Sequence, residues 1–107
     1  MTYRIRFHPL VARDLRVIAQ WVLDYAGPFA ADRTLTTIER TIEGLARTPH
    51  TGSIRNEIAC GLRAIPAGRK AVVAFSVDDK ACEVFIHAVT YAGADWVARM
   101  PQRQHQK

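Results

Sequence analysis

The sequence lacks several features that would narrow its function at once. It has only two cysteines, Cys60 and Cys82, and neither has another Cys or a spaced pair of His nearby. Because a zinc site needs about four ligands at short spacings, two reduced thiols are favoured over a metal site. No run approaches the roughly 20 apolar residues of a membrane helix, and no apolar signal segment follows Thr2-Tyr3-Arg4. We therefore expect a cytoplasmic protein that uses no metal and no cofactor.

Acidic residues are also few relative to basic ones. Ten Asp and Glu oppose fifteen Lys and Arg, of which twelve are Arg, so that the net charge is +5. This excess favours an anionic partner, such as an acidic peptide, a nucleic acid or a nucleic-acid enzyme. It does not select among them, and a surface tuned for solubility accounts for it equally well.

The length of 107 residues is that of one domain. A chain of this size buries roughly two-thirds of its unfolded surface and can fold without disulfides. We assign residues 1–101 to a single domain and 102–107 to a basic, flexible tail.

The first half of the chain has the periodicity of two helices. Apolar residues recur at spacings of three and four, which places each set on one face of a helix. The sets are Val11, Leu15, Ile18, Val22 and Tyr25, then Ala31, Leu35, Ile38, Ile42 and Leu45. Gly27-Pro28 separates the two segments, and Thr48-Pro49 ends the second. We predict helices at Pro9–Tyr25 and Pro28–Arg47 that form an antiparallel hairpin.

Strand patterns flank this hairpin. In Tyr3–His8 the residues Tyr3, Ile5 and Phe7 alternate with polar ones and are expected to be buried. After an irregular stretch at Thr51–Ala59, three strands are predicted: Gly61–Pro66, Arg69–Val77 and Cys82–Thr90. Asp78-Asp79-Lys80 is the turn before the last strand, whose apolar residues on both faces favour a central position. A short helix is predicted at Gly93–Met100.

Helices and strands are thus segregated along the chain. This order predicts an α+β fold: an N-terminal strand, a helical hairpin, a three-stranded antiparallel meander and a short C-terminal helix. The sheet is expected to be mainly antiparallel, with the hairpin on one face.

Short motifs along this order resemble those of the ParE/RelE superfamily of toxins. They are Pro9-Leu10-Val11-Ala12-Arg13-Asp14-Leu15, Gly27-Pro28 with Ala30-Ala31, Pro49-His50-Thr51-Gly52, Gly61-Leu62-Arg63, and Val84, Ile86 and Val89 with Gly93-Ala94-Asp95. Each motif alone is common, but their order and spacing together match over residues 3–96.

The resemblance implies a RelE/ParE-like fold (β-α-α-β-β-β) and the toxin of a type II toxin–antitoxin system, closer to ParE. It also implies a cognate antitoxin that wraps the hairpin and sheet in a hetero-oligomer. ParE-like members are described as inhibiting DNA gyrase without chemistry of their own, whereas RelE-like members cleave mRNA, on the ribosome or free. A degenerate toxin that retains only its interactions is a third possibility.

RNA cleavage would require several groups around one phosphate, including cations and a proton donor. The candidates for this chemistry are Arg63, Arg69, Lys70, His87 and Tyr91. RNA-cleaving relatives carry a basic residue on the last strand and an Arg-rich turn after it, where this sequence has Ala88, Gly93 and Ala94. Since losing one such donor can cost about a hundredfold in rate, the sequence favours a gyrase-binding toxin over an enzyme. His87 is expected to be a partly buried, hydrogen-bonded structural residue. This leaves Arg63, Arg69, Lys70 and Tyr91 as the residues of the RNA-cleaving alternative.

The residues predicted to contact an antitoxin are Arg13, Arg16, Trp21 and Arg63. Trp21 lies on the flank of the first apolar stripe, next to Leu10 and Val17. That widened flank is either part of the core or a groove that receives an antitoxin helix. For the arginines, a solvated surface and an acidic antitoxin segment both remain open.

Overall fold

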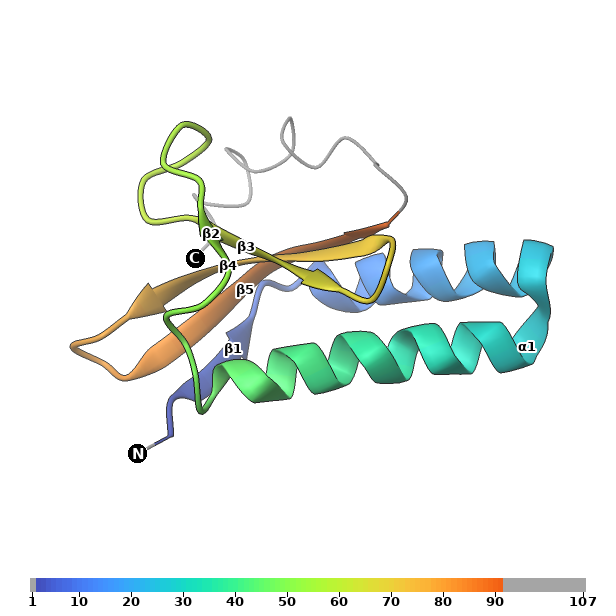
Figure 1. Ribbon diagram of the computed structural model, residues 1–107, viewed down its shortest axis with the longest axis horizontal. Coiled ribbons are helices and arrows are strands. Elements are labelled where there is room, and N and C mark those ends of the chain that lie inside the picture. Colours follow the sequence, from blue (N-terminus) through green and yellow to red (C-terminus); the bar gives the residue numbers. More distant parts are fainter. Residues whose placement is uncertain (1, 92–107) are drawn as a thin grey trace.

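The computed structural model describes residues 2–91. Its elements are β1 (Arg4–Phe7), α1 (Val11–Leu45), β2 (Ser53–Ile54), β3 (Arg63–Ala67), β4 (Ala71–Asp78) and β5 (Glu83–Tyr91). Figure 1 shows α1 folded back on itself and packed on one face of the sheet. The predicted α+β class is confirmed, and β2 adds a two-residue strand inside the stretch expected to be irregular. The helix predicted at Gly93–Met100 and the tail 102–107 lie outside the described residues.

Gly27 divides α1 into two arms. Its backbone angles are non-helical, with φ 90° and ψ 173°, in the region that glycine adopts without the steric cost of a Cβ. Pro28 then opens the second arm, where its missing N–H costs nothing. We call residues 11–26 the N-terminal arm and residues 28–45 the C-terminal arm. The predicted hairpin is confirmed, although its helical residues begin at Val11 and end at Leu45, two residues inside the predicted limits.

The two predicted apolar stripes form most of the core between helices and sheet. Ile18 and Val22 on the N-terminal arm and Ile38 on the C-terminal arm are at most 4% exposed. They join one cluster with sheet residues such as Phe75 and Ile86. Burial of each such side chain contributes about 1.5–3 kcal/mol. This cluster therefore holds the hairpin on the sheet.

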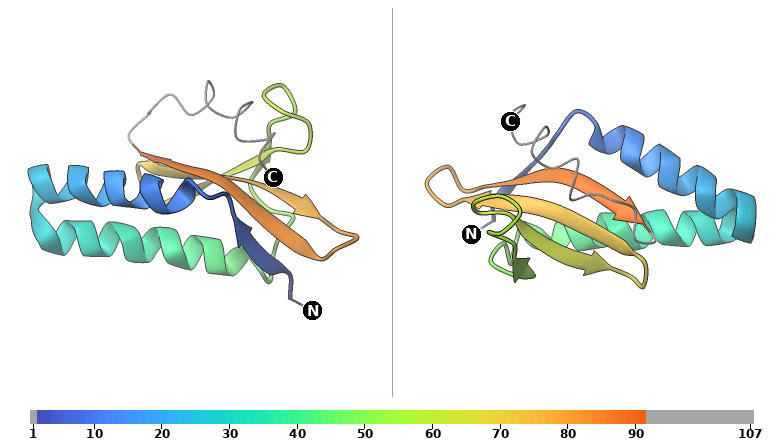
Figure 2. Two further views of the ribbon diagram at one scale, coloured as in Figure 1. Left: turned by 180° about the vertical axis from the view of Figure 1, so that it is seen from behind. Right: turned by 90° about the horizontal axis from the view of Figure 1, so that it is seen from above.

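Tyr25 was expected in this core, and that prediction was wrong. Its side chain is 60% exposed. The connecting end of the hairpin projects beyond the strands in all three views (Figures 1 and 2), so no strand within residues 2–91 covers the last turn of the N-terminal arm. Tyr25 reaches the end of β5 through its hydroxyl. The helical period alone places Tyr25 on the stripe but does not reveal where the sheet ends.

The sheet has the strand order β1-β5-β4-β3-β2. β5 is internal, as its apolar residues on both faces predicted. β1 pairs with β5 in parallel, and the other three pairings are antiparallel. The sheet is therefore mixed, with one parallel pair at the edge that receives the N-terminal strand.

The N-terminal strand departs from its predicted alternation at its last residues. Phe7, expected inside, is 50% exposed, whereas His8 is 1% exposed. β1 ends at Phe7, and the chain turns there toward the helix, with the backbone N–H of Leu10 donating to Nδ1 of His8 at 3.1 Å. The period of two no longer applies beyond the strand end, and the reversal follows from that turn.

Strand limits also differ in the second half. β3 runs through Pro66, which was expected to stop it, because β2 pairs only with Arg63 and Ala64 and leaves that edge open. A proline is tolerated at such an edge, where no neighbour needs its N–H. β4 begins at Ala71 rather than Arg69, and β5 ends at Tyr91 rather than Thr90.

Asp14 fixes the N-terminal arm to β5. It lies on the helix face that carries Val11 and Ile18, is 6% exposed, and its Oδ2 accepts the backbone N–H of Val89 at 3.1 Å. The pairing of β4 with β5 shifts register next to this point, between Ala74 and Phe75. The carboxylate thus satisfies a strand N–H beyond the part of β5 that β1 covers.

Candidate functional site

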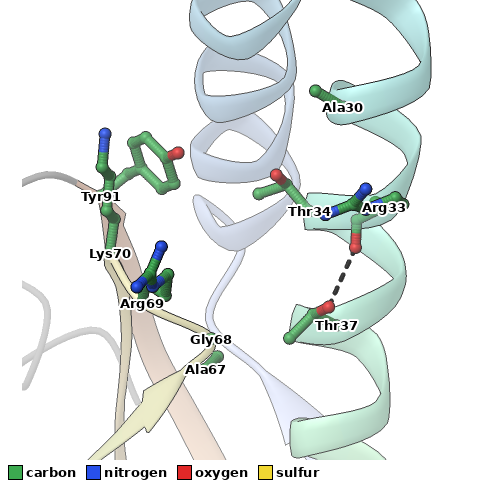
Figure 3. Close-up of a pocket in the computed structure, with 9 residues that line it drawn as sticks. All are labelled: Ala30, Arg33, Thr34, Thr37, Ala67, Gly68, Arg69, Lys70 and Tyr91. Atoms are coloured by element: carbon green, nitrogen blue, oxygen red, sulfur yellow. Dashed lines mark hydrogen bonds between the residues drawn. The ribbon is translucent and has the colours of Figure 1, made fainter. Parts of the chain in front are cut away.

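A basic groove lies between the C-terminal arm and the turn that joins β3 to β4. Its volume is about 260 Å³. The lining residues are Ala30, Arg33, Thr34, Thr37, Ala67, Gly68, Arg69, Lys70 and Tyr91. In Figure 3 the helix residues face those of the sheet across the groove. Three of the predicted RNA-cleaving residues, Arg69, Lys70 and Tyr91, are therefore brought together here, and the helix adds a third cation.

Tyr91, which lines this groove, contacts a second tyrosine, Tyr25. The hydroxyls of Tyr25 and Tyr91 are 2.8 Å apart and share a hydrogen bond, and the Lys70 ammonium lies 5.6 Å from the centre of the Tyr25 ring. The hydrogen bond with Tyr25, together with burial, raises the pKa of Tyr91 above its usual range. The raised pKa favours the protonated Tyr91 phenol, which can donate a hydrogen bond.

Arg63, the fourth residue predicted for RNA cleavage, lies elsewhere. A strand rises about 3.3 Å per residue, so Arg63 lies about 13 Å along β3 from Ala67, where the groove begins. Its guanidinium donates to the carbonyl of Thr51 at 3.3 Å, and the side chain is half-buried. The structure therefore does not gather the four predicted residues around one point.

The surroundings of Arg63 include a second polar cluster. One carboxylate oxygen of Asp79 accepts the Tyr3 hydroxyl at 2.7 Å and lies 2.7 Å from Nε2 of His50. The hydrogen bond to Asp79 raises the pKa of Tyr3 to about 12, and the same bond lowers the pKa of the Asp79 carboxyl. This cluster joins Tyr3, the residue before β1, to the loop after α1 and the β4–β5 turn, which points to a structural role.

His87 is fully buried, and so lies deeper than the partly buried structural histidine expected from the sequence. Its Nε2 lies 2.9 Å from the hydroxyl of Ser76 on the neighbouring strand. Its ring packs against Phe85 at 4.8 Å between centroids. It is not part of the basic groove.

The residues predicted to contact an antitoxin occupy two separate places. Trp21 is 52% exposed and forms an apolar strip with Leu10 and Val17 along one flank of the N-terminal arm. We call these three residues the apolar strip. Arg13 and Arg16 are exposed on the same arm, whereas Arg63 lies on β3 and is separated from β5 by β4. Trp21 is thus outside the core. This excludes the first of the two interpretations of the widened flank, in which it is part of the core, and leaves the antitoxin groove as a hypothesis.

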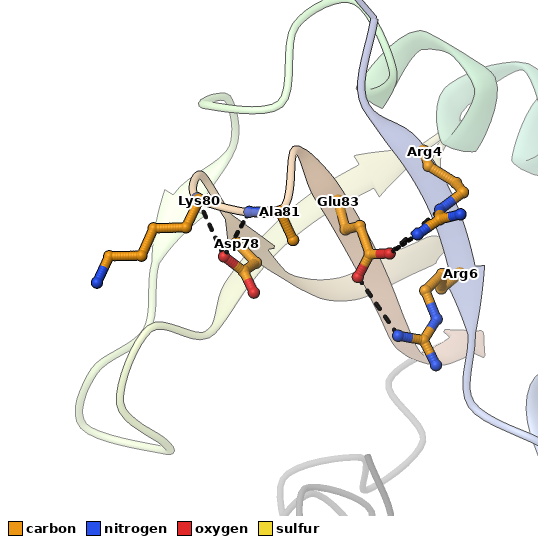
Figure 4. Close-up of polar contacts among 6 residues, drawn as sticks. All are labelled: Arg4, Arg6, Asp78, Lys80, Ala81 and Glu83. Carbon is orange, nitrogen blue, oxygen red and sulfur yellow. Dashed lines mark hydrogen bonds and ion pairs between the residues drawn. The ribbon is translucent and has the colours of Figure 1, made fainter.

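The basic residues of β1 have an acidic partner. Both Arg4 and Arg6 form ion pairs with Glu83 of β5 (Figure 4). The hydrogen bond from Arg4 is the main reason that the pKa of the Glu83 carboxyl is lowered. Close by, the Asp78 carboxylate accepts two backbone N–H groups of the β4–β5 turn at 3.1 Å each. The ion pairs with Glu83 thus offset part of the charge of Arg4 and Arg6.

Sequence reasoning missed Arg33 and Thr34 as groove residues. The signal was present, because Ala30, Arg33, Thr34 and Thr37 follow the spacing of three and four that marks one helix face. That face carries no apolar pattern and so does not differ, in the sequence, from an ordinary solvated helix face. Its polar and small residues show a groove only once the opposite wall is known.

Other classes of site have little support within residues 2–91. No cluster of three potential ligands of the His, Cys, Asp or Glu type is found there, and both cysteines are free. The helical segment of this region has no apolar stretch of the length that a bilayer crossing requires.

Residues 5–96 match the model of the family described as the ParE toxin of the type II toxin–antitoxin system parDE. No curated protein matches the sequence. Among solved structures, a chain of the chromosomal ParDE system from P. aeruginosa superposes with a TM-score of 0.72 and 20% identity, covering 85% of this chain and 97% of that one.

Two further structures have the same fold. A chain of the RelBE2 toxin–antitoxin complex from Mycobacterium tuberculosis has a TM-score of 0.57 and 24% identity, covering 85% of this chain and 92% of that one. A mutant of the E. coli toxin RelE in the free state has a TM-score of 0.65 and 15% identity, covering 97% and 98%. At these identities the likeness shows the fold.

Proposed function

This chain belongs to the ParE toxin family of type II toxin–antitoxin systems, and we propose that it arrests growth in the cytoplasm by binding DNA gyrase. One observation supports binding rather than RNA cleavage: Arg63 lies about 13 Å along β3 from the groove that holds Arg69, Lys70 and Tyr91. Cleavage needs its cations and its proton donor within hydrogen-bond reach of one phosphate.

A cognate antitoxin neutralises the toxin by covering the apolar strip. An exposed tryptophan beside Leu10 and Val17 is the kind of anchor that dominates protein interfaces. Arg13 and Arg16 flank the strip with positive charge and favour an acidic partner segment. A segment that continues across the sheet would reach Arg63. The product is a toxin–antitoxin hetero-oligomer.

The basic groove supports a second candidate function, RNA cleavage. Arg33, Arg69 and Lys70 beside a protonated tyrosine are suited to an RNA phosphate, which favours the RelE-like alternative of an mRNA endonuclease. Such an enzyme would act on the ribosome or on free message. It would have to work without Arg63.

Induction of the chain in bacteria separates the two candidates. Gyrase inhibition predicts broken DNA, SOS induction and slowed DNA synthesis before any change in translation. Rapid translation arrest with cleaved messages would instead establish the RNase, and continued growth at a verified expression level would indicate a degenerate toxin. A Lys70→Ala variant serves as a check, because it would abolish mRNA cleavage and leave gyrase inhibition unchanged.

The antitoxin surface is tested with the product of the adjoining reading frame. We expect Trp21→Ala to weaken the complex at least about tenfold, the usual effect of losing an aromatic anchor. Leu23→Ala is the matched control, because Leu23 is exposed on the same arm but lies about half a helical turn away from Trp21. Equal affinities for the two variants would rule out the apolar strip as the interface.

A further inference from the structure

We propose that the basic groove binds the phosphate group of a nucleotide. The groove lies on the helix side of the sheet, between the C-terminal arm and the β3–β4 turn, and holds Arg33, Arg69 and Lys70 around about 260 Å³ (Figure 3). This site is separate from the apolar strip and does not depend on gyrase binding.

The positive charge of the groove favours binding of an anion. Among residues 2–91, no carboxylate forms an ion pair with Arg33, Arg69 or Lys70, whereas Arg4 and Arg6 share Glu83. The acids of the C-terminal arm, Asp32, Glu39 and Glu43, fall on the opposite flank of the helix, since each residue advances about 100°. Within residues 2–91, the three cations that line the groove therefore have no carboxylate partner.

Hydroxyl groups make the groove better suited to phosphate than to a carboxylate. The Tyr25–Tyr91 pair has two hydroxyl protons, one of which forms the bond between them, so the other is left to donate to a ligand. Thr34 lines the opposite wall and adds a hydroxyl there, whereas the Thr37 hydroxyl already donates its proton to the carbonyl of Arg33 at 3.0 Å. A phosphomonoester carries up to two charges and three acceptor oxygens, and so matches three cations better than a single carboxylate.

The shape of the groove is set by a glycine. Gly68 has φ +77°, and a Cβ at this position would lie 3.3 Å from the Cγ2 of Thr37. The positive φ favours glycine in this turn, and a Cβ would require Thr37 to shift by a few tenths of an ångström. The glycine thus suits the close approach of the turn, which carries Arg69 and Lys70, to the helix that carries Arg33.

Two exposed aromatic rings suggest that the ligand also carries a base. Tyr25 is 60% exposed under Lys70, and Phe29 is 74% exposed with the Arg33 guanidinium 5.7 Å from its ring centre. Exposed rings beside cations are the usual means of holding a base and its phosphate. The groove is also larger than a phosphate alone requires. The phosphate belongs either to a free nucleotide or to a single strand of nucleic acid.

The test is a titration of the purified full chain by calorimetry with inorganic phosphate, with adenosine 5′-monophosphate and with a single-stranded tetranucleotide. For an open groove we expect the two nucleotide probes to saturate with Kd values on the order of 1 mM or lower. Arg33→Ala and Lys70→Ala should each raise Kd at least about fivefold, because each removes a charged contact. Arg40→Ala is the matched control, since it removes the same charge from the same arm two turns further on, outside the groove.

Amide chemical-shift mapping on the unaltered chain provides a readout that needs no variant. We expect the nucleotide to shift residues 30–37 and 67–70. Tighter binding of the monophosphate would identify a free nucleotide as the ligand, and tighter binding of the tetranucleotide a strand. The proposal is overturned if neither nucleotide saturates, if Arg40→Ala weakens binding as much as the groove variants, or if a glutamate-rich peptide binds the groove more tightly. Failure here would leave the gyrase proposal standing, because the assay contains no gyrase.

Discussion

Asp14→Ala should destabilise the fold more than any other single change at a polar helix residue described above. The Asp14 carboxylate is buried and accepts the N–H of Val89, 75 residues away along the chain. A hydrogen bond to a charged group is worth about 1.5–3 kcal/mol, and a buried N–H left without an acceptor costs about 1–3 kcal/mol. We therefore expect a loss of about 2–3 kcal/mol, out of a total stability of roughly 5–15 kcal/mol.

The assay is urea denaturation of the full chain, followed by far-UV circular dichroism. Asp24→Ala is the control, because Asp24 accepts only an exposed bond from Gln20 and should change stability by less than about 0.5 kcal/mol. Asp14→Asn keeps an acceptor oxygen and should lose about half as much as Asp14→Ala. Hydrogen exchange at the Val89 amide should accelerate in the alanine variant. If Asp14→Ala and Asp24→Ala are equally stable, the contact with β5 does not hold the hairpin in place.

The remaining predictions concern the core and two ion clusters. Phe75→Ala should cost about 3–5 kcal/mol in denaturation, against less than about 0.5 kcal/mol for the exposed Phe29→Ala, and equal costs would place the core elsewhere. NMR titration should find the pKa of Tyr3 at about 12 and return it toward 10 in Asp79→Asn; an unchanged pKa would refute that hydrogen bond. Because the fold lowers the pKa of the Glu83 carboxyl, this group stabilises the folded state at pH values above its pKa in the unfolded chain. That stabilisation is lost as the pH falls through its pKa in the folded chain. Glu83→Gln should therefore lose less stability than the unaltered chain between about pH 5 and pH 3 in urea titrations, and parallel losses would contradict this.

The helical hairpin could be predicted because its signals are local. Spacings of three and four define the stripes, and Gly27-Pro28 marks the break without any knowledge of the partner surface. The same pattern failed at Tyr25, since the extent of the sheet decides whether a residue on the stripe is covered. Phe7 failed for a related reason, because the chain leaves the strand at that residue.

The sheet was predictable in its strands but less so in its pairings. The apolar composition of β5 indicates burial on both faces, and β5 is indeed internal. Nothing local distinguishes a parallel from an antiparallel neighbour, so the parallel pairing of β1 with β5 was not foreseen. The sequence predicted that β3 ends at Pro66. The strand continues because the short β2 leaves the edge beside Pro66 open, and the length of this neighbouring strand cannot be read from the residues around Pro66.

The groove was the least predictable feature. Arg69, Lys70 and Tyr91 were singled out by residue type, but their meeting with Arg33 depends on how closely the hairpin approaches the β3–β4 turn. The same reasoning grouped Arg63 with them, although the direction of β3 carries it to the other end of the strand. The chemical type of each side chain can be read from the sequence. Whether side chains from different elements meet at one site depends on how those elements pack.

We propose above that this chain inhibits gyrase by binding. The most direct test of this proposal is a supercoiling assay with purified gyrase, relaxed plasmid and the full chain, with and without the protein encoded by the adjoining reading frame. We expect dose-dependent loss of supercoiling that this partner reverses at stoichiometric amounts. Full supercoiling activity at a large excess of folded toxin, together with cleavage of messages in a translation extract, would contradict it.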